Sequence, residues 1–200
     1  MSLLHRRAPG VGGVRPVTYE VLTFNLVGNV TATNNGTTSV DLVKASGSAV
    51  WGSDSAYTST GWTAPVTLEF FKNSHVFDNG VSYAMISLNE DPATDSNYAS
   101  LDYASYPYRT DAISIYHNGT QIIGAGISSV SYDTAAKFYI SYATDGYLYH
   151  YNASKLLYST NWGTGKTLYI DSAFYSVDSY YTKFYNIRLT KRVWNGTRYT

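Results

Sequence analysis

This sequence consists of short segments in which apolar and polar residues alternate, separated by residue pairs typical of tight turns. This pattern constrains the fold more than any other feature. Asn118-Gly119 separates ISIYH from TQIIG, and Asp145-Gly146 separates FYISYAT from YLYHY. Both pairs tolerate the positive φ angles of type I′ turns, which join neighbouring antiparallel strands. No segment keeps a helical period for more than about two turns. The pattern therefore predicts an all-β chain of hairpins arranged as a two-sheet antiparallel β-sandwich.

Strands are expected where apolar and polar residues alternate. In the first, over residues 17–27, Leu22, Phe24 and Leu26 fall on one face, which we expect to be buried. Eight more strands are predicted at residues 38–44, 65–72, 81–88, 111–117, 137–143, 147–152, 166–174 and 182–190. Cysteine is absent, so packing rather than disulfide bonds must hold these strands together.

The chain divides into a short arm and one domain. Residues 1–16 contain two prolines and three glycines without apolar periodicity, so we predict an extended N-terminal arm. Residues 17–200 are predicted to form a single β-sandwich domain, a length that undivided sandwiches commonly have. The start of the chain lacks the apolar segment of a signal peptide, and no stretch has the length and apolar character of a membrane span.

Charge is distributed unevenly although the formal net charge is zero. Residues 1–16 carry three basic residues and residues 183–200 carry five, and neither segment contains an acid. We therefore expect both ends to contact an acidic partner. Nucleic acid is the weaker candidate, because no nucleic-acid-binding motif accompanies the charges, and the acidic middle of the same or a neighbouring subunit is preferred. The predicted partner-binding residues are Arg6, Arg7, Arg15, Lys191, Arg192 and Arg198.

Several motifs in order along the chain resemble the concanavalin A-like jelly rolls, and within them the SPRY-like and laminin-G-like modules. The motifs are VSYAMISLNEDP, YASLDYA, DAISIYHNGTQI, AKFYISYATDGYLYHYNASKLL and KFYNIRLTKRVW, and the match covers roughly residues 40–194. It departs at Ser87 and Ala153, where those families usually have Gly. The composition, rich in Asn and in Tyr, also resembles structural proteins of large DNA viruses and phages.

Catalytic constellations are missing from the sequence. Retaining glycosidases of this fold carry their carboxylates on one strand as Glu-x-Asp-x-Glu, but no acid stands two residues from Glu20, Glu69 or Glu90. The four histidines do not have zinc-ligand spacing, and no Gly-x-Ser-x-Gly elbow occurs. We therefore expect a protein that is not an enzyme.

The acidic segment NEDPATDSN, residues 89–97, is weighed as a calcium loop. Its weak candidate ligands are Glu90, Asp91 and Asp95, since carboxylate oxygens are the ligands that calcium takes. The spacing does not match an EF-hand, and the alternative is an ordinary solvated loop. No cofactor is therefore expected.

Tyr147, Tyr149 and Tyr151 occupy alternate positions and so share one face of their strand. They form either the inner wall of the sandwich or an exposed platform for a sugar, and we favour the inner wall because of their large apolar area. An exposed platform is expected instead from rings elsewhere, especially in LDYASYPYR, which is interpreted as a loop. These rings are Trp51, Trp62, Tyr103, Tyr106 and Tyr108, and the last four are the candidate glycan-binding residues.

Three classes of function follow. The preferred one is a virion structural protein, a minor capsid, vertex or fibre-associated component that contacts other capsid or fibre proteins or further copies of itself. The alternative is a lectin-like head that binds a host glycan during attachment. The third, an enzyme, has no site that the sequence identifies.

Overall fold

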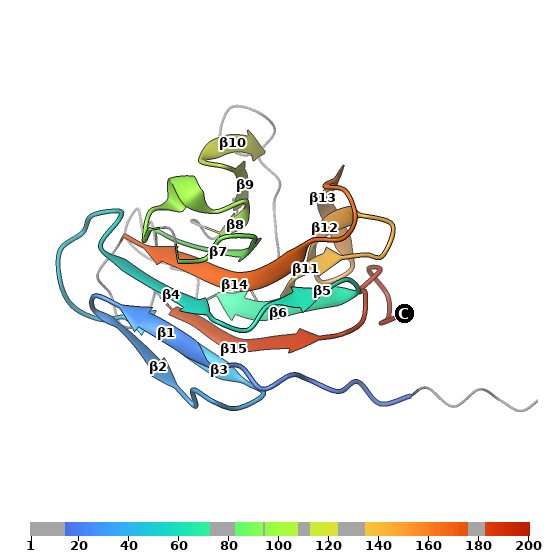
Figure 1. Cartoon of the computed structure of the whole chain (residues 1–200), viewed down its shortest axis with the longest axis horizontal. Helices are drawn as coiled ribbons and strands as arrows, with labels where there is room; N and C mark the ends of the chain where they lie inside the picture. The colour runs from blue at the N-terminus through green and yellow to red at the C-terminus, as the bar shows by residue number, and fades with distance from the viewer. Residues whose placement is uncertain (1–14, 73–82, 94, 108–112, 124–134, 176–182) are drawn as a thin grey trace, which may run out of the picture.

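The chain folds into two antiparallel β-sheets packed face to face. The computed structural model describes residues 15–72, 83–93, 95–107, 113–123, 135–175 and 183–200 (Figure 1). Eight strands form one sheet in the order β1-β4-β14-β7-β8-β9-β10, with β5 also paired to β14, and seven form the other in the order β13-β12-β11-β6-β15-β3-β2. The predicted two-sheet sandwich is thus confirmed.

The eight-stranded sheet consists of β1 (Phe24–Val27), β4 (Asp54–Thr58), β5 (Trp62–Thr63), β7 (Ala84–Asn89), β8 (Tyr103–Pro107), β9 (Ile113–His117), β10 (Thr120–Ile123) and β14 (Thr167–Phe174). The seven-stranded sheet consists of β2 (Val30–Thr33), β3 (Val40–Lys44), β6 (Val66–Lys72), β11 (Phe138–Tyr142), β12 (Tyr147–Asn152), β13 (Lys155–Asn161) and β15 (Lys183–Thr190). One short 3-10 helix, η1 (Tyr98–Ser100), is the only helix among the described residues, and none of them forms a helix fit to span a membrane.

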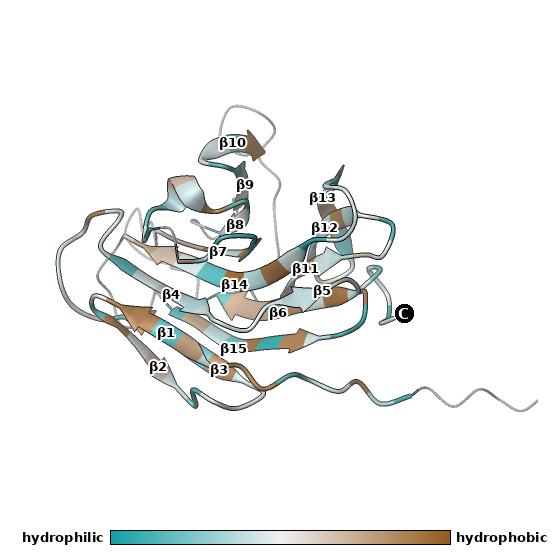
Figure 2. Cartoon of the chain, viewed as in Figure 1, coloured by the Kyte–Doolittle hydropathy of each residue, from teal (hydrophilic) through white to brown (hydrophobic). Residues whose placement is uncertain are grey.

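Alternation along each strand sends one set of side chains into a core shared by the two sheets. Apolar and polar residues follow each other along β14 and β15, as Figure 2 shows. In the seven-stranded sheet the Phe70 ring lies 5.4 Å from that of Phe138 and 5.5 Å from that of Phe184. Phe174 reaches the same cluster from the eight-stranded sheet, at 5.8 Å from Phe184. Aromatic packing therefore joins the two sheets at their centre.

Two polar pairs also bridge the sheets inside the core. Lys44 on β3 and Asp54 on β4 are both buried, with Nζ 2.8 Å from Oδ2. Burial opposes the ionised form of Asp54, yet the hydrogen bonds from Lys44 and its other neighbours outweigh it and lower the pKa of the carboxyl. His150 on β12 faces Ser105 on β8, and Nδ1 lies 2.9 Å from the hydroxyl oxygen. Each pair satisfies buried polar groups that would otherwise be costly.

All nine predicted strand segments contain a strand, but two local expectations are wrong. Leu22 and Phe24 are buried as expected, whereas Leu26 is 42% exposed because β1 is the edge of its sheet. Asn118 and Gly119 both have positive φ, as a type I′ turn requires. At the other hairpin only Gly146 does, and the Ala143 carbonyl accepts from Gly146 N, so the connection is a longer loop.

The segment LDYASYPYR is not the loop that the sequence indicated. Its residues Tyr103–Pro107 form β8, which lies between β7 and β9 in the eight-stranded sheet. Every residue of β8 is buried, because the core covers one face and the loop before the strand helps to cover the other. The expected exposed rings of this segment are therefore absent from its described part.

Candidate functional site

Aromatic rings gather on the outer face of the eight-stranded sheet, the face that points away from the other sheet. Met85, Ala104 and Tyr106 form the buried base of this cluster. Trp51 stands over them from the loop between β3 and β4, with ring centroids 5.0 Å from Tyr98 and 5.5 Å from Tyr175. Both Trp51 and Tyr98 keep part of their rings in solvent.

The loop between β7 and β8 brings polar groups to the same rings. Asp95 Oδ1 accepts hydrogen bonds from Asn97 N at 2.7 Å and from Ser100 Oγ at 2.8 Å. Asn97 in turn caps η1 through a hydrogen bond from Ala99 N. A Cβ on Gly52, next to Trp51, would lie 3.8 Å from Asn97 Nδ2, so the two loops are adjacent. We call Trp51, Asp95, Asn97 and Tyr98 the loop site.

Hydrogen bonds fix the loop site while leaving polar atoms available. Asp95 Oδ2 and Asn97 Nδ2 have no hydrogen-bond partner within the described ranges. Ser96 Oγ, between them, lies 3.0 Å from Ser55 Oγ of β4 and ties the loop to the sheet below. The arrangement offers an acceptor, a donor and two partly exposed rings on a backbone that is already ordered.

Beneath the loop lies a buried carboxyl. Asp171 on β14 accepts hydrogen bonds from Asn89 Nδ2 at 2.9 Å and from Ser172 N at 2.7 Å. Burial raises the pKa of Asp171 to about 8, the two hydrogen bonds oppose the shift, and the negative charges of Asp91 and Asp95 add to it. Strongly perturbed carboxyls occur preferentially at functional sites, which supports this face as the candidate site.

The three predicted glycan-binding residues that the structure describes occupy two different environments. Trp62 and Tyr103 are buried in the core between the sheets, and the Tyr103 ring stacks on His117. Tyr106 is buried at the base of the aromatic cluster, below the loop site. Tyr108 lies outside the described residues. Among the three that the structure describes, Tyr106 belongs to the aromatic cluster below the loop site, and a glycan-binding role for the four residues stays a prediction.

The acidic loop residues are engaged with protein groups. Glu90 forms an ion pair with Lys166, and its backbone N–H donates to Asp102 Oδ2 at 2.7 Å. Burial raises the pKa of Asp102, this hydrogen bond opposes the shift, and the charges of Asp91 and Glu90 add to it. Among the described residues no three His, Cys, Asp or Glu side chains form a group that could hold a metal ion.

Tyr147, Tyr149 and Tyr151 point away from the core, so the favoured inner-wall interpretation is wrong. Leu148 and His150 are fully buried, while Tyr147 is 40% exposed. We call the three residues the tyrosine ladder. Its ring centroids are 6.0 and 6.2 Å apart, and successive planes differ by 24° and 28°. The ladder lies on the outer face of the seven-stranded sheet, on the other side of the sandwich from the loop site.

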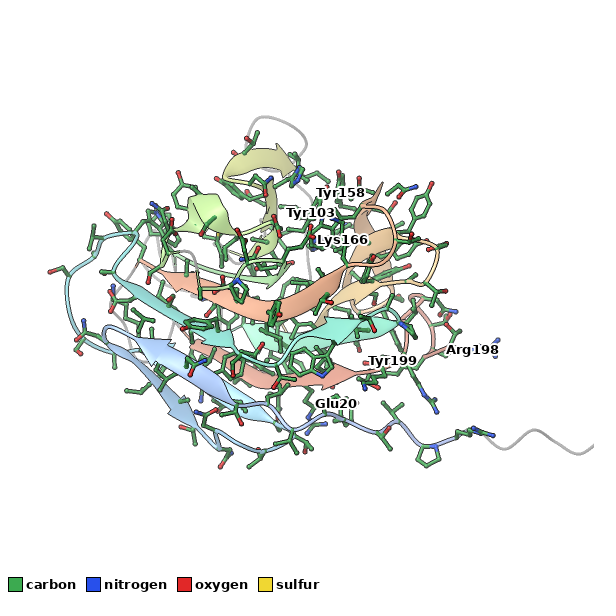
Figure 3. The ribbon with its side chains drawn as sticks, in the orientation of Figure 1. Glu20, Tyr103, Tyr158, Lys166, Arg198 and Tyr199 are labelled. Atoms are coloured by element: carbon green, nitrogen blue, oxygen red, sulfur yellow. The ribbon has the colours of Figure 1, made fainter. Side chains whose placement is uncertain are left out.

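The C-terminal residues 191–200, the C-terminal tail, fold back over the seven-stranded sheet. The Trp194 ring stacks on Tyr139 of β11 at 4.5 Å. Tyr199 Oη donates to the buried carboxylate of Glu69 at 2.5 Å, and Lys137 Nζ lies 3.1 Å from the same oxygen. Burial, with the charge of Glu69, raises the pKa of Tyr139 to about 12. Figure 3 labels Arg198 and Tyr199 on this tail and Glu20 on the N-terminal segment, where Glu20 N donates to the Leu189 carbonyl of β15.

The predicted basic partner-binding residues are only partly described. Arg192 donates to the carbonyl oxygens of Arg15 and Pro16 and thus contacts the N-terminal segment of its own chain. Lys191 and Arg198 are exposed. Arg6 and Arg7 lie outside the described residues. The partner-binding role of these residues, the capsid or fibre partners and the virion location stay predictions.

Sequence reasoning did not select Tyr98 or Asp171. No short motif marks either residue, because the loop site combines two loops that are distant in sequence. The acidic loop was noticed for its carboxylates and Trp51 for its ring, but their proximity depends on the order of strands in the sheet.

Comparison with known proteins establishes the fold. No protein-family model matches the chain, and no curated protein matches it. The exoplasmic/lumenal domain of VIP36, in a Ca2+/Man3GlcNAc-bound form, aligns at 13% identity over 90% of this chain and 85% of its own, with a TM-score of 0.52.

Two further solved structures are similar at the same level. CBM66, a carbohydrate binding module from Bacillus subtilis, aligns at 12% identity over 88% of this chain and 99% of its own, with a TM-score of 0.52. Lectin I-B4 from Griffonia simplicifolia aligns at 15% identity over 84% of this chain and 92% of its own, with a TM-score of 0.52. The chain is therefore a two-sheet sandwich with the concanavalin A-like jelly-roll fold.

Proposed function

We propose that this protein is a glycan-binding module and that the loop site holds the sugar. The observation that carries the proposal is the position of Asp95 and Asn97 beside the rings of Trp51 and Tyr98. A sugar ring has one face rich in C–H groups and a rim of hydroxyls. It is therefore recognised by an aromatic surface together with a few fixed hydrogen-bonding groups.

The chemistry of each residue gives it a role. The rings of Trp51 and Tyr98 supply apolar area against which a sugar face packs. Asp95 Oδ2 accepts hydrogen bonds from sugar hydroxyls, and a charged acceptor makes a stronger hydrogen bond than a neutral one. Asn97 Nδ2 donates to a hydroxyl oxygen. Because both side chains are already held by backbone hydrogen bonds, little ordering entropy is lost on binding.

The fold adds weaker support, since the similar structures named above include lectin and carbohydrate-binding domains. Fold alone does not determine function, so the residues of the loop site carry the proposal. In this proposal the chain acts by binding, and the absence of catalytic activity stays a prediction.

A glycan array tests the proposal. The labelled chain is expected to bind a defined subset of glycans, and Trp51→Ala should weaken that binding at least tenfold because it removes the main stacking surface. Asp95→Asn should weaken it to a similar extent. Asp91→Asn makes the same change of charge in the same loop and serves as the matched control, with binding unchanged. Retained binding by Trp51→Ala and Asp95→Asn would show that the sugar lies elsewhere.

A further inference from the structure

The tyrosine ladder is a second aromatic surface, separate from the loop site. It lies on β12, and its exposure rises from 8% at Tyr151 to 40% at Tyr147. On the neighbouring edge strand β13, Asn161 pairs with Tyr147 and Ser159 with Tyr149, while the exposed Leu156 pairs with the buried Tyr151. Small polar residues are therefore tolerated at exposed positions here, so the exposed ring of Tyr147 and the half-buried ring of Tyr149, in line with buried Tyr151, need a reason beyond folding.

The three rings of the tyrosine ladder are regularly spaced. Residues two apart on a strand project from the same face, so the three side chains follow one line. Their centroids are spaced 6.0 and 6.2 Å apart and therefore span about 12 Å at most. This spacing is close to the repeat of one sugar unit in an extended chain, so consecutive units can contact consecutive rings.

The tyrosine ladder is bounded by the C-terminal tail at its Tyr151 end and by two glycines at its Tyr147 end. At the Tyr151 end, a Cβ on Gly196 of the C-terminal tail would lie 3.2 Å from the Tyr151 ring, so the tail stands against that ring. Tyr139, the cross-strand partner of Tyr151, is covered by Trp194. At the Tyr147 end lie Gly146 and Gly163, whose backbones are in close contact and carry no side chains. A ligand that continues past Tyr147 meets no bulky side chain from these two residues.

Polar groups beside the tyrosine ladder suit a neutral hydroxylated ligand. Asn161 pairs with Tyr147 and Ser159 with Tyr149, and both are exposed on the same face as the rings. Asn161 Oδ1 accepts from Gly163 N, which orients its amide nitrogen. Of the charged residues nearest in sequence, Asp145 accepts a hydrogen bond from Tyr147 N at 3.1 Å, and Lys155 pairs with Asn152, one residue past Tyr151. Rings with hydroxyls, flanked by short uncharged side chains, match sugar chemistry better than the charged rim of a protein interface.

The geometry points to the tyrosine ladder as a second binding site, for an extended chain of neutral sugar units. The chain lies along Tyr151, Tyr149 and Tyr147, with its end at the C-terminal tail and its continuation past Gly146. Asn161 and Ser159 hydrogen-bond its hydroxyls. This inference rests on the proposed carbohydrate binding for its ligand class but uses different residues on the opposite sheet.

The ladder is tested by calorimetry with three linear hexasaccharides, cellohexaose, chitohexaose and maltohexaose, and with the disaccharide of each. At least one hexasaccharide is expected to bind ten times or more tighter than its disaccharide, because it contacts three rings rather than one or two. Tyr149→Ser should reduce that affinity at least tenfold. Leu26→Ser removes an exposed apolar side chain from the edge of the other sheet and should leave the affinity unchanged.

The outcomes separate this inference from the proposed function. Hexasaccharide binding that survives Trp51→Ala and is lost in Tyr149→Ser supports the ladder. Binding that is lost in Trp51→Ala and kept in Tyr149→Ser overturns the ladder and leaves the loop site standing. Equal affinity for disaccharide and hexasaccharide, or no binding of any hexasaccharide, also overturns it. A dimer seen by light scattering that Tyr149→Ser dissociates would assign the ladder to a second copy of the chain instead.

Discussion

The buried histidine of β12 leads to a quantitative prediction about stability in mild acid. His150 is completely enclosed by the core, Nδ1 lies 2.9 Å from Ser105 Oγ, and Nε2 has no hydrogen-bond partner in the described part of the chain. Burial lowers the pKa of His150 from 6.5 to about 3. Between these two values the unfolded chain binds a proton that the folded chain does not. The free energy of unfolding must therefore rise with pH across this window.

The size of the effect follows from the two pKa values. At pH 7 the folded chain is unprotonated at His150 and about a quarter of the unfolded chains are protonated, which favours unfolding by only about 0.2 kcal/mol. At pH 5 protonation favours the unfolded chain by about 2 kcal/mol, and at pH 4 by about 3 kcal/mol, as the linkage relation gives for values of 6.5 and about 3. A loss of this size is a large fraction of the stability of a typical domain.

The pH dependence of the free energy of unfolding is measured by urea unfolding, followed by the fluorescence of the four tryptophans. His150→Phe keeps a ring in the site and removes the titration, so the stability difference between wild type and variant should change by about 2 kcal/mol from pH 7 to pH 5. The carboxyl groups titrate in both proteins and cancel in this comparison. Ser105→Ala, which removes the partner of Nδ1, should keep the wild-type pH dependence, because burial causes the shift. Parallel pH profiles for wild type and His150→Phe would refute the reasoning.

Three other measurements test features described above. Lys44→Met leaves Asp54 as an unpaired charge in the core and should lower the free energy of unfolding by about 3–5 kcal/mol, whereas the exposed Lys191→Met should change little. Ala153 has a φ of 50°, so Ala153→Gly should stabilise the chain by about 1 kcal/mol, while Ala32→Gly within β2 should destabilise it. Sugar binding at the loop site should be the same in EDTA as in calcium, since Glu90 is paired with Lys166 and Asp95 Oδ1 already accepts two hydrogen bonds; a loss in EDTA would contradict this.

The sandwich itself could be predicted because its signals are local. Alternation marks strands such as β6 and β14, and the Asn118-Gly119 pair marks a hairpin through the backbone angles that it tolerates. β8 was missed because both of its faces are buried, so Tyr103 and Ser105 on one face show no contrast with Ala104 and Tyr106 on the other. Alternation identifies a strand only where the residues of its two faces differ in polarity, as in β6, whose Thr67 and Glu69 contrast with Leu68.

The orientation of β12 could not be read from residue sizes. The comparison of apolar area favoured the tyrosines as the inner face, yet Leu148 and His150 fill the core. The reason lies on the opposite sheet, where Ser105 gives His150 a hydrogen-bond partner and makes its burial tolerable. The loop site could not be predicted from the sequence for a similar reason. The contact between Trp51 and Tyr98 depends on the order in the sheet of strands that are far apart in sequence.

The packing of the C-terminal tail on the seven-stranded sheet determines where the protein should be tagged or immobilised. Thr200 N donates to the Val193 carbonyl at 2.9 Å, and Tyr199 reaches a carboxylate that is closed off from water. A purification tag joined directly after Thr200 would emerge over the outer face of the seven-stranded sheet, which also carries the tyrosine ladder. Anchoring the protein to a sensor chip through that tag would therefore restrict access to this face. Attachment through an engineered cysteine on the edge strand β1 of the other sheet avoids this region. The N-terminal segment does not, because Arg192 of the tail donates to the carbonyl oxygens of Arg15 and Pro16.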